Sequence, residues 1–251
     1  MIKVIVNGCN GKMGNILVKS VNNDEEVIVV AGIDRNINKQ NHPFPVYSHP
    51  SKCLEKGDVL IDFSHHSLIS DVLNYCVHTK TPLVLATSGI ASDQKEQLLT
   101  ASHAIPILQS PNMSLGVNVI IDLVKKATET LGHSFDIEIV EKYHNKKVDS
   151  PSGTTLMLAN GIKDTFKEQT HFIFGRHGNN DDRKDTDIGI HSVRGGTFMG
   201  EHTILFAGAD EVVEITHKAL SKDIFALGAI KAAKFLVDKK NGFYTMNDLL
   251  K

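Results

Sequence analysis

The chain has 251 residues, of which 41% are hydrophobic and 22% charged, the balance of an ordinary soluble globular protein with room for one large domain or two modest ones. Its formal net charge of -2 at pH 7 gives no reason to expect nucleic acid or an anionic membrane as a partner. The longest apolar runs, such as residues 27–33, are too short to cross a bilayer, and the opening residues, MIKVIVNG, lack the layout of a signal peptide.

The first half of the chain alternates short apolar runs with stretches of helical periodicity. Strands that are buried on both faces of a sheet are continuously apolar, and these runs have that character. The predicted strands are residues 2–6, 26–33, 58–63, 82–87 and 104–110, and the predicted helices are residues 11–21, 66–79 and 92–102. This β-α-β order predicts an α/β fold with a Rossmann-type, doubly wound parallel sheet.

The pattern changes after residue 114. We predict helices at 115–131, 153–166 and 224–239, a polar loop at 175–187, and strands at 135–141, 188–194, 201–209 and 211–219. Gly195-Gly196 favours a hairpin turn between the strands at 188–194 and 201–209. The chain is therefore expected to contain a dinucleotide-binding domain at 1–114, an α+β domain at 115–224, and a segment at 225–251 whose amphipathic helix returns to complete the first domain.

Three glycines stand between the first predicted strand and the first predicted helix. Gly8, Gly11 and Gly14 form a G-x-x-G-x-x-G loop, where glycine lets the backbone approach a pyrophosphate and the helix start supplies free N–H groups. A tight turn without a ligand is the alternative. After the second strand, Asp34 is placed to bind the ribose of NAD, and Arg35 is placed to bind the 2′-phosphate of NADP. A solvated turn pair is the alternative there, and we predict that NADH and NADPH are both used.

A basic loop precedes a helix start in the second half. The loop contains Lys142, His144, Lys146 and Lys147, and Ser152-Gly153-Thr154 opens the next helix. Lysines are usually solvated, and Ser-Gly-Thr after proline can be only a helix cap. Together, ammonium groups facing backbone N–H groups and hydroxyls make a carboxylate-binding site. The sequence therefore predicts a small anionic substrate with more than one carboxylate.

The stretch from Tyr143 to Lys147 also has the Tyr-x-x-x-Lys spacing of short-chain dehydrogenases. In those enzymes both residues lie on one face of a helix. Here the tyrosine follows a predicted strand directly, and Pro151 leaves little room for a helix across both side chains. The glycine loop also departs from the turn of that class. The short-chain interpretation is rejected on both grounds.

Several motifs along nearly the whole chain point to one family. They are GCNGKMG, DVLIDFS, ATSG, SPNMSLGVN, KKVDSPSGTT, VRGGTFMGEHTILFAGADEVVEITHKA and FALGA. With these motifs the chain resembles the 4-hydroxy-tetrahydrodipicolinate reductase (dihydrodipicolinate reductase) family of lysine biosynthesis by the diaminopimelate route. The resemblance implies NAD(P)H-dependent reduction of a cyclic imine dicarboxylate to tetrahydrodipicolinate. It also implies a substrate domain whose mixed sheet builds a homotetramer.

The resemblance assigns roles by position. Cofactor contacts fall on Gly8, Cys9, Asn10, Gly11, Lys12 and Met13, on Asp34 and Arg35, on Ala86, Thr87 and Ser88, and on Ser110, Pro111, Asn112 and Met113. Substrate contacts fall on His144, Lys147, Gly153 and Thr154. The family usually has two adjacent histidines, the first assigned to proton transfer, where this chain has Tyr143 and His144. Our hypothesis is that Lys147 carries the essential proton while Tyr143 orients the substrate or relays a proton through water.

Two rival functions and two further residue groups complete the sequence interpretation. The rivals are another NAD(P)-dependent reductase of a related dicarboxylate, and a nicotinamide-binding sensor that has lost its proton donor. Retention of Lys147 and of the Ser-Gly-Thr helix start argues against the sensor. Three cysteines without metal-type spacing predict free thiols in a reducing cytoplasm. His65-His66 lacks a third ligand and is interpreted as a pair of helix-start or cleft-edge polar residues, so no metal site is predicted.

Overall fold

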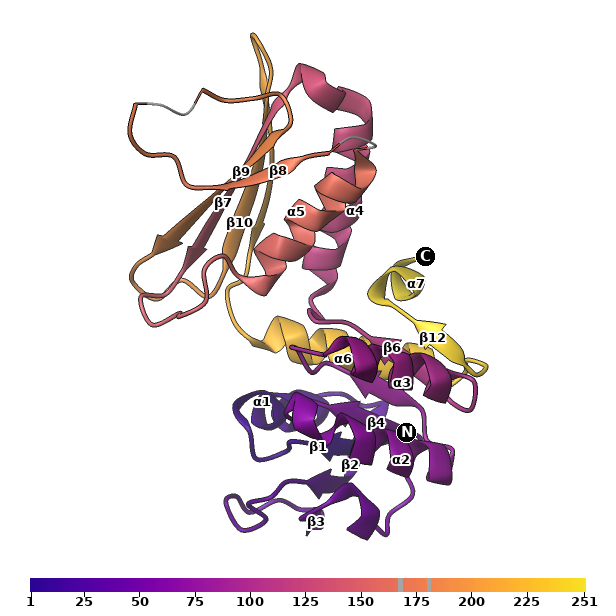
Figure 1. Cartoon of the computed structure of the whole chain (residues 1–251). Coiled ribbons are helices and arrows are strands. Elements are labelled where there is room, and N and C mark those ends of the chain that lie inside the picture. The colour runs from indigo at the N-terminus through magenta and orange to yellow at the C-terminus, as the bar shows by residue number, and fades with distance from the viewer. Residues whose placement is uncertain (167–168, 180–181) are drawn as a thin grey trace. The chain divides into compact units, whose positions relative to one another are not determined.

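The computed structural model describes residues 1–166, 169–179 and 182–251. Contacts along the chain divide it into two compact units, the first formed by residues 1–115 and 222–251 and the second by residues 116–221 (Figure 1). No helix within these described ranges is long and apolar enough to cross a membrane.

The first unit contains a parallel sheet of the Rossmann type. Its order is β12-β6-β5-β4-β1-β2-β3, and every neighbouring pair runs parallel. The strands are β1 (Ile2–Asn7), β2 (Val27–Ile33), β3 (Val46–Tyr47), β4 (Val59–Asp62), β5 (Leu83–Leu85), β6 (Pro106–Gln109) and β12 (Gly242–Tyr244). The predicted doubly wound sheet is confirmed, and β3 and β12 are additions at its two edges.

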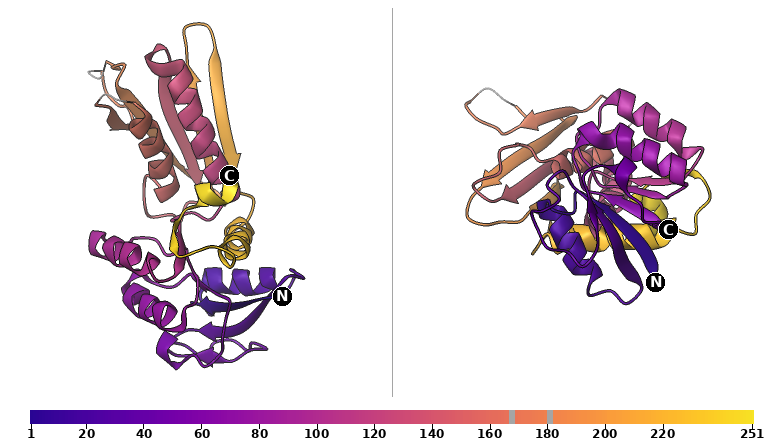
Figure 2. Two further views of the ribbon diagram at one scale, coloured as in Figure 1. Left: turned by 90° about the vertical axis from the view of Figure 1, so that its right-hand side faces the viewer. Right: turned by 90° about the horizontal axis from the view of Figure 1, so that it is seen from below.

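Helices cover both faces of this sheet. The helical elements are α1 (Lys12–Val21), η1 (Pro50–Lys52), η2 (His66–Leu68), α2 (Ile69–Thr79), α3 (Ser92–Ser102), α6 (Asp223–Leu236) and α7 (Met246–Leu250). Helices α1 and α6 lie on one face of the sheet, and α2 and α3 lie on the other (Figure 2). Apolar side chains of α1 and α6 share one core with the sheet, and those of α2 and α3 share a second core. At Gly228 of α6 a side chain would collide with the carbonyl of Met113, so glycine permits the close approach of this helix.

The second unit is a mixed sheet of order β11-β10-β7-β9-β8, with helices along one face (Figure 1). Its elements are α4 (Leu115–Leu131), η3 (Gly132–Ser134), β7 (Asp136–Tyr143), α5 (Gly153–Thr165), β8 (His171–Phe174), β9 (Asp187–Arg194), β10 (Glu201–Ala207) and β11 (Val212–Lys218). Strands β7, β8 and β9 are parallel, and β10 is antiparallel to β7 and to β11. Alternate apolar side chains of these strands pack on α4 and α5. The predicted combination of a Rossmann-type unit and an α+β unit with a mixed sheet is confirmed.

The predicted hairpin at Gly195-Gly196 is wrong. Strand β7 lies between β9 and β10, so these two strands do not pair. Because β9 runs parallel to β7, the chain must cross the end of β7 before it returns as β10. The crossing is held by the Gly195 N–H, which donates to the carbonyl of Tyr143 at 3.0 Å, and by the His144 N–H, which donates to the carbonyl of Phe198 at 2.9 Å. The hairpin of this unit instead joins β10 to β11.

The loop predicted at 175–187 ends one residue earlier than predicted, because Asp187 is the first residue of β9. Residues 175–179 and 182–186 form neither helix nor strand, and residues 180 and 181 lie outside the described part of the chain. The strand predicted at 135–141 extends to Tyr143. This extension places the tyrosine at the end of an ordered strand.

Candidate active site

The glycine loop has the geometry that a dinucleotide requires. Gly8 has a φ of +82°, and a Cβ there would lie 2.9 Å from the carbonyl oxygen of Phe63. A side chain at Gly14 would collide with the carbonyl of Gly8, and Gly11 is the N-cap of α1. Glycine at positions 8 and 14 therefore lets the loop turn tightly against its own backbone, and the first N–H groups of α1 have no acceptor within the helix.

Burial and hydrogen bonds hold the side chains of this loop in place. Cys9 and Asn10 are buried, and burial raises the pKa of the Cys9 thiol to about 12. The Asn10 amide donates to the carbonyl of Asn36 at 2.7 Å, and its backbone N–H donates to Asp34 at 3.1 Å. Cys9 and Asn10 can thus offer a ligand mainly their backbone groups.

The residues predicted at the adenosine ribose and at the start of α1 lie at the edge of this loop. Asp34 is half-buried and accepts the two backbone N–H groups of Asn10 and Asn36. Arg35 and Lys12 are exposed, and Met13 is half-buried. The Asp34 carboxylate therefore fixes the backbone of this loop, and its contact with the ribose stays a prediction.

A buried carboxylate that the sequence analysis missed organises the neighbouring strand ends. Asp62 at the end of β4 accepts from Asn7 at 2.7 Å and from Thr87 at 2.6 Å. Burial raises the pKa of Asp62, against the opposing effect of hydrogen bonds from Ser64, Thr87 and Asn7. Because the ends of β1, β4 and β5 are in register here, one carboxylate fixes the loops that follow all three strands.

The remaining predicted cofactor residues follow β5 and β6. Ala86 is half-buried, while Ser88 and Pro111 are exposed at the same carboxyl-terminal edge of the sheet. Four others are buried: Thr87, Ser110, Asn112 and Met113. The Ser110 hydroxyl donates to the carbonyl of Asn112 at 2.8 Å, which fixes the turn after β6. The four buried residues therefore stabilise the carboxyl-terminal edge of the sheet, whereas Ser88 and Pro111 are accessible to a ligand.

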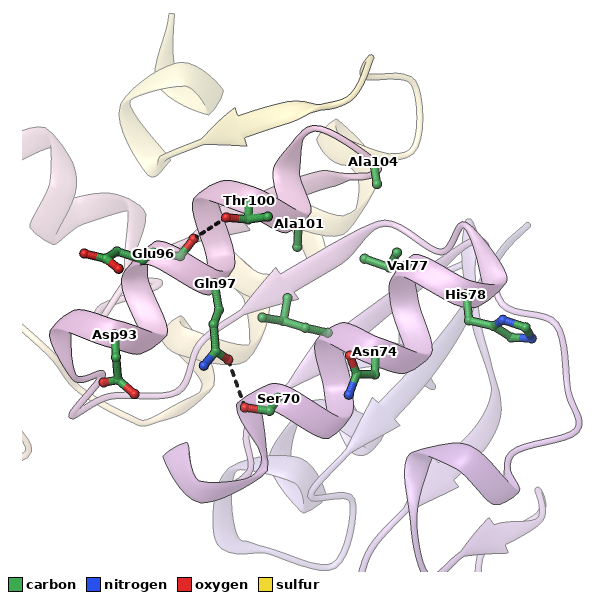
Figure 3. A pocket seen from close by; sticks show the side chains of 11 residues that line it. Ser70, Asn74, Val77, His78, Asp93, Glu96, Gln97, Thr100, Ala101 and Ala104 are labelled. Atoms are coloured by element: carbon green, nitrogen blue, oxygen red, sulfur yellow. Dashed lines mark hydrogen bonds between the residues drawn. The ribbon is translucent and has the colours of Figure 1, made fainter.

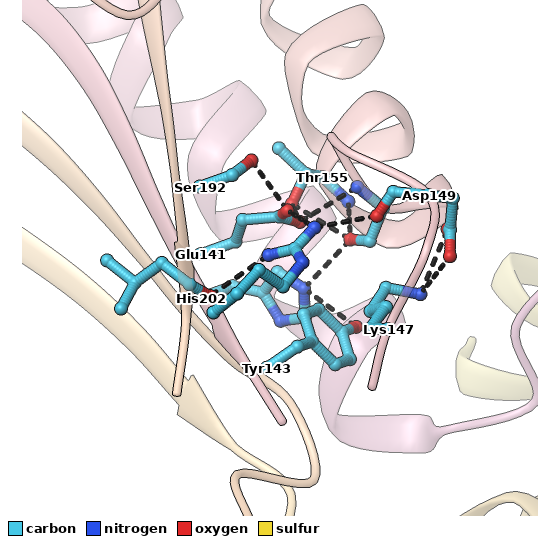
Figure 4. Close-up of polar contacts among 10 residues, drawn as sticks. Glu141, Tyr143, Lys147, Asp149, Thr155, Ser192 and His202 are labelled. Carbon is cyan, nitrogen blue, oxygen red and sulfur yellow. Dashed lines mark hydrogen bonds and ion pairs between the residues drawn. The ribbon is translucent and has the colours of Figure 1, made fainter. Parts of the chain in front are cut away.

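In the second unit, Glu141 of β7 is the centre of a polar network (Figure 4). This carboxylate is 0% exposed. It accepts four hydrogen bonds, from the Ser152 N–H at 2.9 Å, the Thr155 hydroxyl at 2.6 Å, the Ser192 hydroxyl at 2.7 Å and Arg194 Nη2 at 2.6 Å. Burial alone would raise the pKa of Glu141, but these hydrogen bonds outweigh it and lower the pKa to about 2.

Cross-strand register explains how this network arises. Glu141 lies opposite Ser192 of β9 and opposite His202 of β10. It follows Ile137 and Ile139 on the face of β7 that packs on the helices, a position where an apolar side chain is expected. A glutamate continuing an alternating apolar face is a signal that could have identified the network from the sequence.

Tyr143 lies at the outer side of this network. Its hydroxyl is 3.2 Å from His202 Nε2, and the two rings meet edge to face. Lys147 Nζ lies 4.5 Å and Arg194 Cζ 5.6 Å from the centre of the tyrosine ring, within the range of cation–π attraction. His202 is 2% exposed, and burial lowers its pKa to about 4, so the imidazole is neutral at pH 7.

The predicted substrate residues are brought together only in part. Lys147 is bound by both oxygens of Asp149, at 2.8 and 2.9 Å, and this ion pair lowers the pKa of Asp149. Gly153 and Thr154 are the first residues of α5, whose N-cap is Ser152. His144 leaves β7 at the start of the same loop and is half-buried. The carbonyl of Asp149 accepts from Arg194 at 2.7 Å, which connects the lysine-bearing loop to the network.

The other lysines of the basic loop differ. Lys142 pairs with Glu201 at 2.7 Å, so the expected solvated character applies to Lys146 and not to Lys142. His65 accepts the Ser67 N–H at the start of η2, which confirms its interpretation as a helix-start residue.

A separate cavity of about 1030 Å³ lies between α2 and α3 (Figure 3). Its polar lining includes Ser70 and Gln97, which are hydrogen-bonded to each other at 2.9 Å. None of the predicted cofactor or substrate residues lines it. The cavity is therefore separate from the predicted cofactor-binding residues of the first unit.

A Rossmann-type sheet with a glycine loop in one unit, and a lysine with a helix start for anions in the other, define the class of NAD(P)-dependent oxidoreductases. Residues 2–113 match the family described as dihydrodipicolinate reductase, N-terminus, and residues 116–250 match dihydrodipicolinate reductase, C-terminus. The chain belongs to the dihydrodipicolinate reductase family, which confirms the resemblance found in the sequence.

Individual relatives agree with this assignment. The chain is 48% identical to 4-hydroxy-tetrahydrodipicolinate reductase of Caldanaerobacter subterraneus subsp. tengcongensis, over 100% of this chain and 99% of the relative. It is 43% identical to the enzyme of that name from Clostridium novyi, with the same coverage. The fold is similar to that of dipicolinate-bound dihydrodipicolinate reductase from Paenisporosarcina sp. TG-14, with a TM-score of 0.82 and 23% identity over 98% of this chain and 99% of the other.

Proposed function

We propose that this chain catalyses the NAD(P)H-dependent reduction of 4-hydroxy-tetrahydrodipicolinate to tetrahydrodipicolinate in the diaminopimelate route of lysine biosynthesis. The prediction made from the sequence is supported by the match of the whole chain to the reductase family. NADH and NADPH are the cofactors, and the substrate is a small dicarboxylate. The structural observation that carries the proposal is the loop from Tyr143 to Thr154, where an ammonium group and a helix N-terminus lie in one short segment.

For the cofactor, the loop of Gly8, Gly11 and Gly14 has the tight turn at a helix start that is typical of dinucleotide-binding loops. We assign Gly8 to Met13 to the pyrophosphate, and Asp34 with Arg35 to the adenosine ribose. The segments from Ala86 to Ser88 and from Ser110 to Met113 are assigned to the nicotinamide side. When bound, the nicotinamide supplies the hydride.

For the substrate, we assign carboxylate binding to His144, Lys147, Gly153 and Thr154. Lys147 is only 19% exposed, whereas its partner Asp149 is 61% exposed. A substrate carboxylate can therefore replace Asp149 on the ammonium group while Asp149 turns to water, at little cost in solvation. The side of Gly153 that a Cβ would occupy has no atom within 4 Å, so an oxyanion can approach the first turn of α5.

For the proton, we assign the essential donor to Lys147, and the orientation of the substrate or a relay through water to Tyr143. An ammonium group is a charged hydrogen-bond donor, and it makes a stronger hydrogen bond to an anionic ligand than a neutral hydroxyl does. The position of Lys147 Nζ, 4.5 Å from the centre of the Tyr143 ring, supports action of both groups on one ligand.

We further propose that the protein is a cytoplasmic homotetramer assembled through the five-stranded sheet. One face of this sheet packs on α4 and α5, and the strand β11 at its edge is largely exposed, including Val212 at 56% and Val213 at 36%. An exposed apolar edge strand favours pairing with another chain. Three free cysteines are consistent with a reducing compartment. Light scattering should give four times the chain mass of 27.5 kDa, and a monomer mass at micromolar concentration would contradict this assembly.

A coupled assay tests the reaction. The aldol product of pyruvate and aspartate semialdehyde is generated in the cuvette, and NADH or NADPH absorbance is followed. We expect oxidation that depends on that product and that falls sharply for Lys147→Ala. Binding of NADH without any substrate-dependent oxidation would instead favour the sensor, and oxidation only with a different dicarboxylate would favour the related reductase.

A further inference from the structure

His202 and Tyr143 are joined to Glu141 by a continuous set of polar contacts (Figure 4). His202 Nε2 lies 3.2 Å from the Tyr143 hydroxyl and 3.4 Å from the Ser152 hydroxyl. The Ser152 hydroxyl lies 3.0 Å from that of Thr155, which donates to Glu141 at 2.6 Å. The contacts therefore run from a buried carboxylate to a tyrosine in the proposed substrate site.

The direction of each hydrogen bond in this set follows from the carboxylate. An ionised carboxylate can only accept, so the Thr155 hydroxyl proton is committed to Glu141. The Ser152 hydroxyl proton has two possible acceptors, the Thr155 oxygen and His202 Nε2. The Thr155 oxygen is the nearer of the two, so Ser152 donates to it. With its proton on Thr155, Ser152 can only accept from His202.

The ring of His202 gives an independent indication of the same direction. Its Nδ1 is buried and has no hydrogen-bond partner among the residues that the structure describes. A neutral imidazole carries one proton, and a proton on Nδ1 would be a buried donor without an acceptor. A proton on Nε2 instead has two acceptors within reach, the oxygens of Tyr143 and Ser152.

We propose that His202 is a positioning residue that donates from Nε2–H to the Tyr143 hydroxyl oxygen, so that the tyrosine proton is left for the substrate. In this arrangement Tyr143 acts as a directed donor to the ligand. The cations Lys147 and Arg194 near its ring hold the same orientation. The proposal rests on the proposed function for the identity of the ligand, and the direction of the hydrogen bonds is independent of it.

The charged groups around this pair come from several elements. They are Glu141 on β7, Lys147 and Asp149 on the following loop, Arg194 on β9, Glu201 on β10 and His217 on β11. Glu141 and Glu201 favour a charged His202, whereas burial, His217 and Lys147 oppose it, and the opposing effects prevail. The imidazole therefore stays a neutral donor across the pH range in which the enzyme would be assayed.

Nitrogen NMR of the protein labelled with 15N-histidine tests the tautomer directly. The chain has 13 histidines, and the resonances of His202 are identified by their loss in His202→Gln. We expect a neutral ring at pH 7 with the proton on Nε2. A proton on Nδ1, or a doubly protonated ring, would overturn the proposal. This measurement needs no enzymatic activity, so its result is separate from the test of the reductase reaction.

A double-mutant cycle tests the functional coupling. His202→Leu removes the donor, and we expect a loss of about tenfold in kcat, the value of one hydrogen bond, with NADH binding retained. In a Tyr143→Phe background the same substitution should cost less than about twofold, because the hydroxyl it positions is absent. His202→Gln, which keeps an N–H donor, should recover most of the lost kcat. Equal losses in both backgrounds would show that His202 only packs. If His202→Leu does not fold, His202→Gln in the two backgrounds gives the same comparison on a smaller scale.

Discussion

The buried Glu141 carboxylate should give the stability of this protein a defined dependence on acid pH. Its pKa is lowered from 4.5 to about 2. Since each pKa unit between the unfolded and folded chain corresponds to about 1.4 kcal/mol, ionisation of this group contributes on the order of 3 kcal/mol to the free energy of unfolding. The folded-state pKa is the lower one, so this contribution is complete above about pH 4.5 and is lost as the pH falls toward 2.

Glu141→Gln tests this value. The amide replaces one acceptor oxygen by an NH₂ group, so two of the four donors lose their acceptor, at a cost of about 2–4 kcal/mol at pH 7. The amide does not titrate. The difference in unfolding free energy between parent and variant should therefore shrink by about 1.4 kcal/mol between pH 7 and pH 3.5.

Urea unfolding measures both quantities, at one fixed chain concentration because an oligomer is stabilised by mass action. The matched control is Glu129→Gln, which changes an exposed glutamate on α4 of the same unit. The control variant should remain within about 0.5 kcal/mol of the parent at both pH values. A parent–variant difference at Glu141 that does not change with pH would refute the reasoning, since it would mean that the buried group is not held ionised.

Three predictions concern ligands and catalysis. Arg35→Ala should weaken NADPH binding more than NADH binding, with a charge-assisted contact of about 1.5–3 kcal/mol lost, and fluorescence titration showing equal losses would place Arg35 away from the 2′-phosphate. Thr154→Val should weaken competitive inhibition by pyridine-2,6-dicarboxylate, and unchanged inhibition would mean that the carboxylates bind elsewhere. Lys147→Ala should lose about 10²–10⁴-fold in kcat with NADH binding retained, Tyr143→Phe should lose much less, and Tyr143→His should retain or gain activity near pH 7. A Tyr143→Phe variant as inactive as Lys147→Ala would make the tyrosine the proton donor.

Elements with a long periodic pattern were predictable from the sequence, and short ones were not. Helix α4 has the predicted bounds because its apolar spacing persists over several turns, and α3 also has the predicted bounds although it is largely polar, with Leu98 and Ser102 as its buried residues. Strands β3 and β12 contain two and three residues, too few to show any period. The Gly195-Gly196 pair correctly indicated a turn, but turn residues do not reveal which strand becomes the neighbour, and the intervening β7 was missed for that reason.

The candidate site divides along similar lines. Glycine loops and helix starts are local patterns, so the turn at Gly8 and Gly14 and the start of α5 at Gly153 were predictable from the sequence alone. The roles of Glu141 and His202 depend on the register of β7 against β10, which brings together residues 61 positions apart in the chain. Only the folded sheet shows that contact. The Lys147–Asp149 pair is local, but the sequence does not show which of its alternative partners the lysine selects.

The transfer of hydride to the cyclic dicarboxylate is tested most directly by isotope transfer. NADH carrying deuterium at both C4 positions is supplied with the aldol product of pyruvate and aspartate semialdehyde, and the reduced product is analysed by mass spectrometry. Our account predicts that tetrahydrodipicolinate gains the mass of one deuterium with the parent chain, and that this product is strongly reduced with Lys147→Ala. Oxidation of the labelled NADH without deuterium in the product would contradict the account.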